Sequence, residues 1–285
     1  MRIDLHTHSS VSDGTDTPAA LLSAALAAGL DVVALTDHDT TAGWGPAEAA
    51  RPPGLTVVPG MELSCRWFPA DEPPISVHLL AYLFDPLHPA FVAERARLRE
   101  ERLTRGERIV TALAAAGHPV VWEQIVERSA GGVVGRPHIA RALLEAGVVA
   151  SVDEAFGTLL HHRSPYYAAK ADTDVLDGIT LVRAAGGVPV FAHGRARSRG
   201  RVVGDAAIAA MVEAGLVGLE VDHPDHTPEE RAHLRGLADA HGLLTTGSSD
   251  YHGTNKLTPI GACTTDPAQY EALLAAGTGT AVLAD

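Results

Sequence analysis

The sequence has little cysteine, no long apolar run and fewer cationic than anionic residues. Cys65 and Cys263 stand alone among 285 residues, without a CxxC spacing, and predict no disulfide framework. No run of 18 apolar residues occurs, which argues against a membrane-spanning helix. The net charge of −13 argues against a protein that grips long duplex nucleic acid. A strand expected from residue 2 leaves no room for a signal peptide, so these absences favour a cytoplasmic protein.

Motifs for a protein nucleophile are also missing. No GxSxG or P-loop sequence occurs, and no Ser/His/Asp or Cys/His arrangement suggests covalent catalysis. Histidine, in contrast, is abundant, with 15 residues. Some of these are interpreted as surface or helix-end residues, but the rest follow apolar runs where strands are expected to end. Together with nearby carboxylates they predict one polar pocket that binds several metal ions, and hence a hydrolase.

Short apolar strands alternate with Ala/Leu-rich helices along the chain, a rhythm typical of βα units in a parallel sheet. Seven such strands indicate an α/β fold, a TIM-like (β/α) barrel one unit short of eight. In barrels of this kind the reactive groups lie at the carboxyl ends of the strands, where the candidate ligands fall here. The strands are expected at residues 2–5, 32–35, 57–58, 75–83, 188–191, 217–221 and 243–246.

The connection between the fourth and fifth expected strands is about 100 residues long, far more than one helical crossover requires. Residues 86–172 are therefore predicted to form an inserted helical lid subdomain, and residues 1–85 and 173–285 the barrel. The insertion leaves the barrel at the end that carries the candidate ligands. Its expected role is to cover the pocket.

The candidate ligands begin with His6 and His8, which are two residues apart on an extended segment. Their imidazoles project on one face and can share a cation. Glu62 follows Pro-Gly-Met at a strand end, and its two carboxylate oxygens can bridge two ions. The further candidate ligands are Asp13, His38, His78, His193, Asp250 and His252.

Five segments of the chain resemble motifs of the PHP (polymerase and histidinol phosphatase) superfamily, in the same order and spacing. The resemblance covers essentially the whole chain and implies a distorted (β/α)7 barrel. Two departures lie beside candidate ligands, because the family often has Ala-His-Pro and Gly-Ser-Asp where this chain has Ala-His-Gly and Ser-Ser-Asp. Neither departure removes a ligand. The matching segments are Asp4-Leu-His-Thr-His-Ser, Thr36-Asp-His-Asp, Gly60-Met-Glu, Ala192-His and Ser249-Asp-Tyr-His.

The resemblance implies a centre of two or three divalent cations. The first would be held by His6, His8, Glu62 and Asp250. The second would share Glu62 and add His78 and His193. The third would take Asp13, His38 and His252. Imidazole and carboxylate ligands without thiolate suit Mn, Fe or Zn.

Such a centre suits an anionic phosphate ester, because three divalent cations outweigh the three carboxylates among the ligands. A metal-bridging hydroxide can attack phosphorus directly and needs no protein nucleophile. Glu62 and Asp250 would support this step as ligands.

Residues outside the metal centre are expected to contact the substrate. Arg136 and His138, in a segment before a predicted helix, and Lys170, at the end of the insertion, are the candidate substrate-binding residues; the two cationic side chains would contact phosphate oxygens. His223 or His226 would protonate the leaving oxygen.

Within the superfamily the chain is most similar to stand-alone members whose helical insertion carries a GRPHIA-type segment. These include nucleoside 3′,5′-bisphosphate phosphatases and the 5′→3′ exoribonuclease called ribonuclease AM. The resemblance implies a phosphoesterase acting on a nucleotide or on the 5′ end of a short oligoribonucleotide. Two alternatives remain: a phosphatase of a small metabolite such as histidinol phosphate, and a non-catalytic metal-bearing binding module. The oligomeric state stays open.

Overall fold

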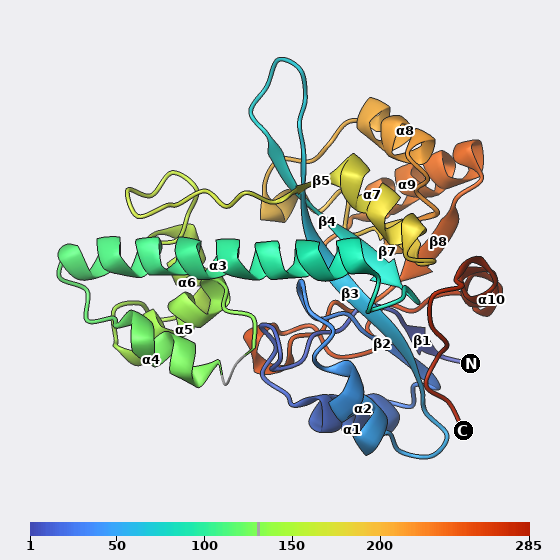
Figure 1. Ribbon diagram of the computed structural model, residues 1–285, viewed down its shortest axis with the longest axis horizontal. Coiled ribbons are helices and arrows are strands. Elements are labelled where there is room, and N and C mark those ends of the chain that lie inside the picture. Colours follow the sequence, from blue (N-terminus) through green and yellow to red (C-terminus); the bar gives the residue numbers. More distant parts are fainter. Residues whose placement is uncertain (130–131) are drawn as a thin grey trace.

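The strands of the protein form one curved sheet (Figure 1). This computed structural model describes residues 1–129 and 132–285. Its strand order is β1-β2-β3-β4-β6-β7-β8, with β5 paired to β3 off this path. A parallel bridge between Thr7 and Tyr251 brings the two ends together, so the sheet is nearly closed. The predicted seven-strand barrel is confirmed. The strands are β1 (Ile3–Asp4), β2 (Val32–Leu35), β3 (Thr56–Trp67), β4 (Ile75–Tyr82), β5 (Thr173–Asp174), β6 (Val188–Phe191), β7 (Gly218–Asp222) and β8 (Leu244–Gly247).

The helices begin and end at residues suited to those positions. The Thr227 side chain caps the first turn of α9 in a capping box with Glu230, and Gly242 ends this helix in a left-handed conformation. Within the described residues, no helix is long and apolar enough to cross a membrane. The α-helices are α1 (Pro18–Ala27), α2 (Trp44–Ala50), α3 (Pro89–Ala115), α4 (Trp122–Arg128), α5 (Arg136–Glu145), α6 (Val152–Gly157), α7 (Val175–Ala184), α8 (Asp205–Glu213), α9 (Pro228–His241) and α10 (Pro267–Ala276).

Strand β4 differs from the expected parallel rhythm, because it runs antiparallel to both β3 and β6. The reason is the short connection of residues 68–74 between β3 and β4, which can form a hairpin but cannot hold a crossover helix. The reversal brings the start of β4 to the barrel end where its neighbours finish. A residue early in β4 can therefore face the same pocket as residues that follow the other strands.

The two faces of the sheet belong to different parts of the core. Alternate residues such as Val32, Leu80 and Val190 form one cluster with Tyr270 and Leu273 of α10. The intervening residues pack against the surrounding helices α1, α2, α7 and α8. The sheet is thus buried on both faces, and the polar side chains gather at one end of it.

Helices α3 to α6 lie between β4 and β5 along the chain, and α3 extends far beyond the barrel (Figure 1). Phe91 and Leu98 of α3 pack into the barrel core, whereas Ile109 and Leu113 belong to a separate core formed with α4, α5 and α6. One continuous helix therefore connects the barrel core to the second core, that of the predicted lid. The limits of the insertion, 86 and 172, stay a prediction.

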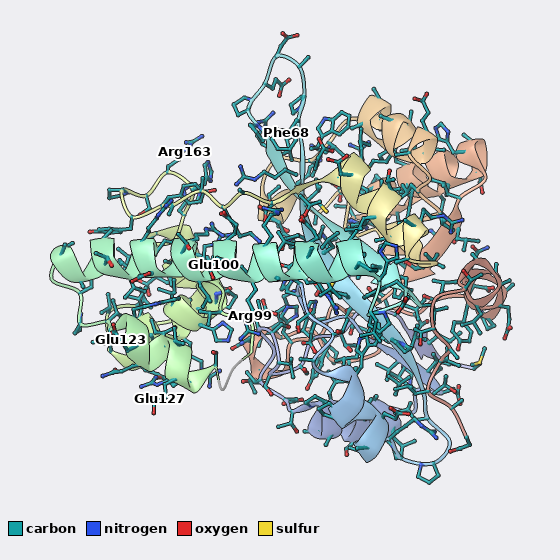
Figure 2. All side chains as sticks on the ribbon, in the orientation of Figure 1. Phe68, Arg99, Glu100, Glu123, Glu127 and Arg163 are labelled. Atoms are coloured by element: carbon teal, nitrogen blue, oxygen red, sulfur yellow. The ribbon has the colours of Figure 1, made fainter. Side chains whose placement is uncertain are left out.

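The outer surface of the lid is charged. Figure 2 shows Arg99 and Glu100 on α3 and Glu123 and Glu127 on α4, all of them exposed. Phe68, at the start of the β3–β4 hairpin, is a large exposed apolar side chain. These four charged residues of α3 and α4 are thus in contact with solvent.

Candidate metal centre

The nine predicted metal ligands lie together at one end of the barrel. They come from β3, from β4 and from the segments that follow β1, β2, β6 and β8, and those from parallel strands meet because their carboxyl ends share one edge. In each of three overlapping groups the ligand atoms lie within 4.8 Å of one another. The groups are His6, His8, Glu62 and Asp250; His38, Glu62 and His78; and His8, Asp13, His38 and His252. His193 joins them through its contact with Glu62.

Glu62 is at the centre of the cluster, and its two oxygens face different histidines. Oε1 lies 2.6 Å from Nδ1 of His78 and 2.9 Å from Nε2 of His193. Oε2 lies 3.2 Å from Nε2 of His6 and 3.0 Å from Nε2 of His8. This arrangement would allow the carboxylate to bridge two cations.

The unsatisfied polar atoms of the cluster fit a cation. Asp250 Oδ1 and His38 Nδ1 are buried, and neither has a hydrogen-bond partner in the described part of the chain. Nε2 of His6 and Nε2 of His8 lie 3.0 Å apart. Ligand atoms at about 2.1 Å from one metal ion lie roughly 3 to 3.5 Å from each other, which matches these separations. The donors present therefore suit Mn, Fe or Zn, although their assignment to individual ions stays a prediction.

The protonation states also suit metal ligands. Burial alone would raise the pKa of Glu62, but His78, His38 and His6 hold it well below its usual range. Burial, with a smaller contribution from Arg199, lowers the pKa of His193 to about 3. Glu62 is therefore ionised and His193 neutral near pH 7, as coordination requires.

Comparisons with known proteins agree with this geometry. The family model described as PHP domain matches residues 4–119. The 3′,5′-nucleoside bisphosphate phosphatase of Chromobacterium violaceum is 32% identical over 88% of this chain and 87% of its own length. The chain belongs to the PHP family. The 5′-3′ exoribonuclease Rnm of Escherichia coli is also 32% identical, over 87% of this chain and 84% of its own. A crystal structure from Bifidobacterium adolescentis, assigned as a metal-dependent phosphoesterase, has a TM-score of 0.89 and 36% identity over 97% of this chain and 96% of its own.

The PHP barrel contains a buried carboxylate, Glu220 of β7, that sequence analysis did not single out. Its Oε1 lies 3.0 Å from Nδ1 of His6 and accepts a hydrogen bond from the hydroxyl of Ser248. Its Oε2 accepts a hydrogen bond of 2.7 Å from the backbone N–H of His193. Since Glu220 holds His6 Nδ1, it turns Nε2 of that ring toward Glu62. The signal in the sequence was a carboxylate between the apolar residues Leu219 and Val221 of this strand.

The backbone at two of the predicted metal ligands lies in the left-handed region. The φ angle is 31° at His193 and 51° at Asp250, where non-glycine residues are uncommon. These are the two places where the sequence departs from the usual family motif. Gly194 is needed beside His193, because a Cβ there would lie 2.5 Å from the Phe191 ring. Glycine at position 194, where the family often has proline, therefore leaves room for the Phe191 ring.

The predicted lid is joined to the PHP barrel by a buried ion-pair network around Asp39, the residue after the predicted ligand His38. Nε of Arg102 on α3 donates a hydrogen bond of 2.6 Å to Oδ2 of Asp39. Burial alone would raise the pKa of Asp39, but Arg102 and Lys170 hold it well below its usual range. Lys170 is itself buried, with Nζ 2.5 Å from Asp172 and 3.7 Å from Asp39. A contact of Lys170 with a substrate phosphate stays a prediction. The ion pairs of Arg102 and Lys170 with Asp39 hold the predicted lid against the barrel.

The other predicted substrate and acid residues occupy different surroundings. Arg136 donates a hydrogen bond to the carbonyl of Leu160 and lies over the Phe156 ring. His223 is buried with Nε2 3.4 Å from Oδ2 of Asp250, at the edge of the metal cluster. His226 has both ring nitrogens bonded to backbone groups, at Val221 and Arg195. Of the two candidate acids, His223 is the one beside a ligand.

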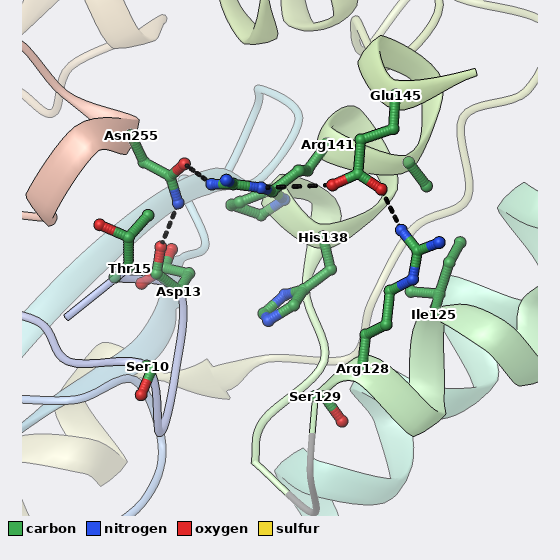
Figure 3. Close-up of a pocket in the computed structure, with 13 residues that line it drawn as sticks. Ser10, Asp13, Thr15, Ile125, Arg128, Ser129, His138, Arg141, Glu145 and Asn255 are labelled. Carbon is green, nitrogen blue, oxygen red and sulfur yellow. Dashed lines mark hydrogen bonds and ion pairs between the residues drawn. The ribbon is translucent and has the colours of Figure 1, made fainter. Parts of the chain in front are cut away.

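A cleft of about 250 Å³ separates α4 and α5 from the loop that follows β1 (Figure 3). The predicted ligand Asp13 lies on one side of it and His138 on the other. The backbone N–H of Gly135 donates to Nδ1 of His138, and burial lowers the pKa of this histidine, so its proton resides on Nε2. Asn255 spans the cleft, since it bonds the backbone carbonyl of Asp13 and also Arg141 of α5.

Proposed function

We propose that this PHP protein hydrolyses a phosphate ester of a nucleotide, such as a nucleoside 3′,5′-bisphosphate, or of the 5′ end of a short oligoribonucleotide. The observation that carries the proposal is Glu62, whose two oxygens face separate histidines. When bound, divalent cations would neutralise the charge of the phosphate oxygens and lower the pKa of an attacking water. The C. violaceum and E. coli relatives, named for a nucleoside bisphosphate and for a ribonuclease activity, support the substrate class.

The residues of the chain would divide the work in the following way. Glu62 and Asp250 would hold the cations as carboxylates, and the surrounding imidazoles would bind in their neutral form. Burial alone would lower the pKa of His6, but neighbouring carboxylates raise it well above its usual range, so this ring would release a proton when a cation binds. His223 is the candidate donor of a proton to the leaving oxygen, because it lies at the edge of the cluster. The cleft beside Asp13 offers space for the part of the substrate that is not cleaved. His138, with its proton on Nε2, would donate a hydrogen bond there, and Arg136 and Lys170 remain candidate contacts.

Phosphate release from adenosine 3′,5′-bisphosphate tests the proposal. Metal-free protein reloaded with Mn²⁺ should release phosphate, and the Glu62→Gln variant should lose this activity, since it loses the bridging charge. The Glu213→Gln variant, which removes one exposed carboxylate on α8, is the matched control and should retain it. A short 5′-phosphorylated RNA distinguishes the two nucleotide substrates.

The alternatives predict different results. A protein that releases phosphate from histidinol phosphate but from neither nucleotide substrate is a metabolite phosphatase. A protein that binds Mn²⁺ and hydrolyses none of the three is a binding module. Either result contradicts the proposed function.

A further inference from the structure

Two cations that sequence analysis did not single out lie directly beside the metal centre. Nη2 of Arg199 is 2.5 Å from Oδ2 of Asp250, and Nζ of Lys256 is 2.6 Å from the same oxygen. Both side chains are about one-third exposed, at 32% and 31%. The two cations are therefore buried enough to be held in place and open enough to meet a substrate.

The two oxygens of Asp250 face in different directions. Oδ1 lies 3.4 Å from Nε2 of His6 and 3.5 Å from Nε2 of His8, so it faces the ligand nitrogens. Oδ2 faces the two cations. Only the Asp250 carboxylate separates the two cations from the predicted metal centre. The ammonium group of Lys256 and the guanidinium group of Arg199 are therefore next to the position that a metal-bound phosphate would occupy.

Both cations retain hydrogen-bond donors for a substrate. Arg199 donates Nε to Oδ2 of Asp225 at 2.7 Å as well as Nη2 to Asp250, which leaves N–H groups on its two terminal nitrogens. Lys256 contacts only Oδ2 and the backbone oxygen of Asp250 among the described residues, and so keeps a third N–H. Since both nitrogens touch one oxygen, a single phosphoryl group can reach both.

We propose that Arg199 and Lys256 form a phosphate clamp that binds non-bridging oxygens of the phosphoryl group at the metal centre. The proposal rests on the proposed function, because it assumes a phosphate ester as substrate. In the clamp, the arginine is oriented by Asp225 and presents a planar fork, and the lysine supplies a compact second charge.

The same loop provides a matched control. Arg197 lies two residues before Arg199, carries the same charge and is bound instead to Glu230, at 3.1 Å. The substitution Arg197→Gln removes one positive charge from the loop without touching Asp250. The substitutions Arg199→Gln and Lys256→Gln remove one clamp cation each, and Arg199→Lys keeps the charge without the fork.

The experiment measures two binding equilibria by calorimetry, first Mn²⁺ with the metal-free protein and then inorganic phosphate with the Mn²⁺-loaded protein. In Arg199→Gln and Lys256→Gln we expect unchanged Mn²⁺ stoichiometry and affinity for phosphate that is about 10- to 100-fold weaker, the loss of a charge-assisted hydrogen bond. Arg199→Lys should recover part of the loss, and Arg197→Gln should stay within about twofold of the wild type. The KM for the nucleotide should rise in parallel with the phosphate dissociation constant.

Three results overturn the clamp. They are a wild-type protein that does not bind inorganic phosphate, clamp variants that bind it as well as the wild type, and variants in which Mn²⁺ and phosphate binding are lost together. The last would show that the cations act only by holding Asp250. Failure of the proposed function is distinct, because the wild type would then bind phosphate yet hydrolyse no nucleotide, and the clamp would stand.

Discussion

The substitution Glu220→Gln tests how the barrel orients its first ligand. Gln has the shape of Glu but only one acceptor oxygen, whereas Glu220 accepts from His193 on Oε2 and from Ser248 on Oε1. If the amide nitrogen of Gln takes the place of Oε2, it faces the backbone N–H of His193, and two donors then meet without an acceptor. An amide nitrogen at Oε1 would force Nδ1 of His6 to accept, and the ring proton would then move to Nε2, the nitrogen required for the metal.

Either orientation costs one hydrogen bond to a charged group, about 1.5 to 3 kcal/mol. Since 1.4 kcal/mol corresponds to a tenfold change, we expect Mn²⁺ affinity to fall by about 10- to 100-fold. Titration calorimetry of the metal-free proteins measures this, with Glu213→Gln as the control that removes an exposed carboxylate. If Glu220→Gln binds Mn²⁺ within about twofold of the wild type, then the carboxylate does not orient His6 and the reasoning is wrong.

Three further predictions concern stability. Arg102→Met leaves Asp39 buried without its guanidinium and should lower the free energy of unfolding by about 3 to 5 kcal/mol in urea denaturation; a loss under about 1 kcal/mol would contradict a structural role. Because burial lowers the pKa of His193 to about 3, the unfolded state binds the extra proton below pH 6.5, and the stability of the metal-free protein should fall as pH falls from 6.5 toward 3. His193→Gln should reduce this slope by about 1.4 kcal/mol per pH unit, and equal slopes in both proteins would refute the shift. Gly194→Ala should cost about 1 to 3 kcal/mol through its clash, whereas Gly236→Ala, in α9 with no atom within 4 Å of the added Cβ, should be neutral or stabilising in the same assay.

The barrel and the ligand candidates could be predicted because their signals are local. Apolar runs mark strands, and His6 and His8 on one extended segment share a face whatever the rest of the chain does. The direction of β4 was expected incorrectly, although the short connection of residues 68–74 already required a hairpin.

The polar surroundings of the site could not be predicted in the same way. Glu220 is one carboxylate in a strand, and its role depends on His6, more than 200 residues away in sequence. Arg199 is one of several arginines in its loop, and only the folded chain shows which of them reaches Asp250. Lys170, whose contact with a substrate stays a prediction, is buried between two carboxylates, and the sequence did not indicate this pairing because Asp39 comes from a distant segment. Long-range contacts of this kind leave no periodic mark in a sequence.

The bridge between Thr7 and Tyr251 has a consequence for the order of events during synthesis. Because synthesis runs from the N-terminus to the C-terminus, His6 and His8 are made long before Asp250 and His252. Until the two ends meet, the emerging chain cannot assemble the complete predicted ligand set, and a chain terminated before residue 250 never acquires it. Metal binding at the predicted group of His6, His8, Glu62 and Asp250 would therefore require that the barrel has closed.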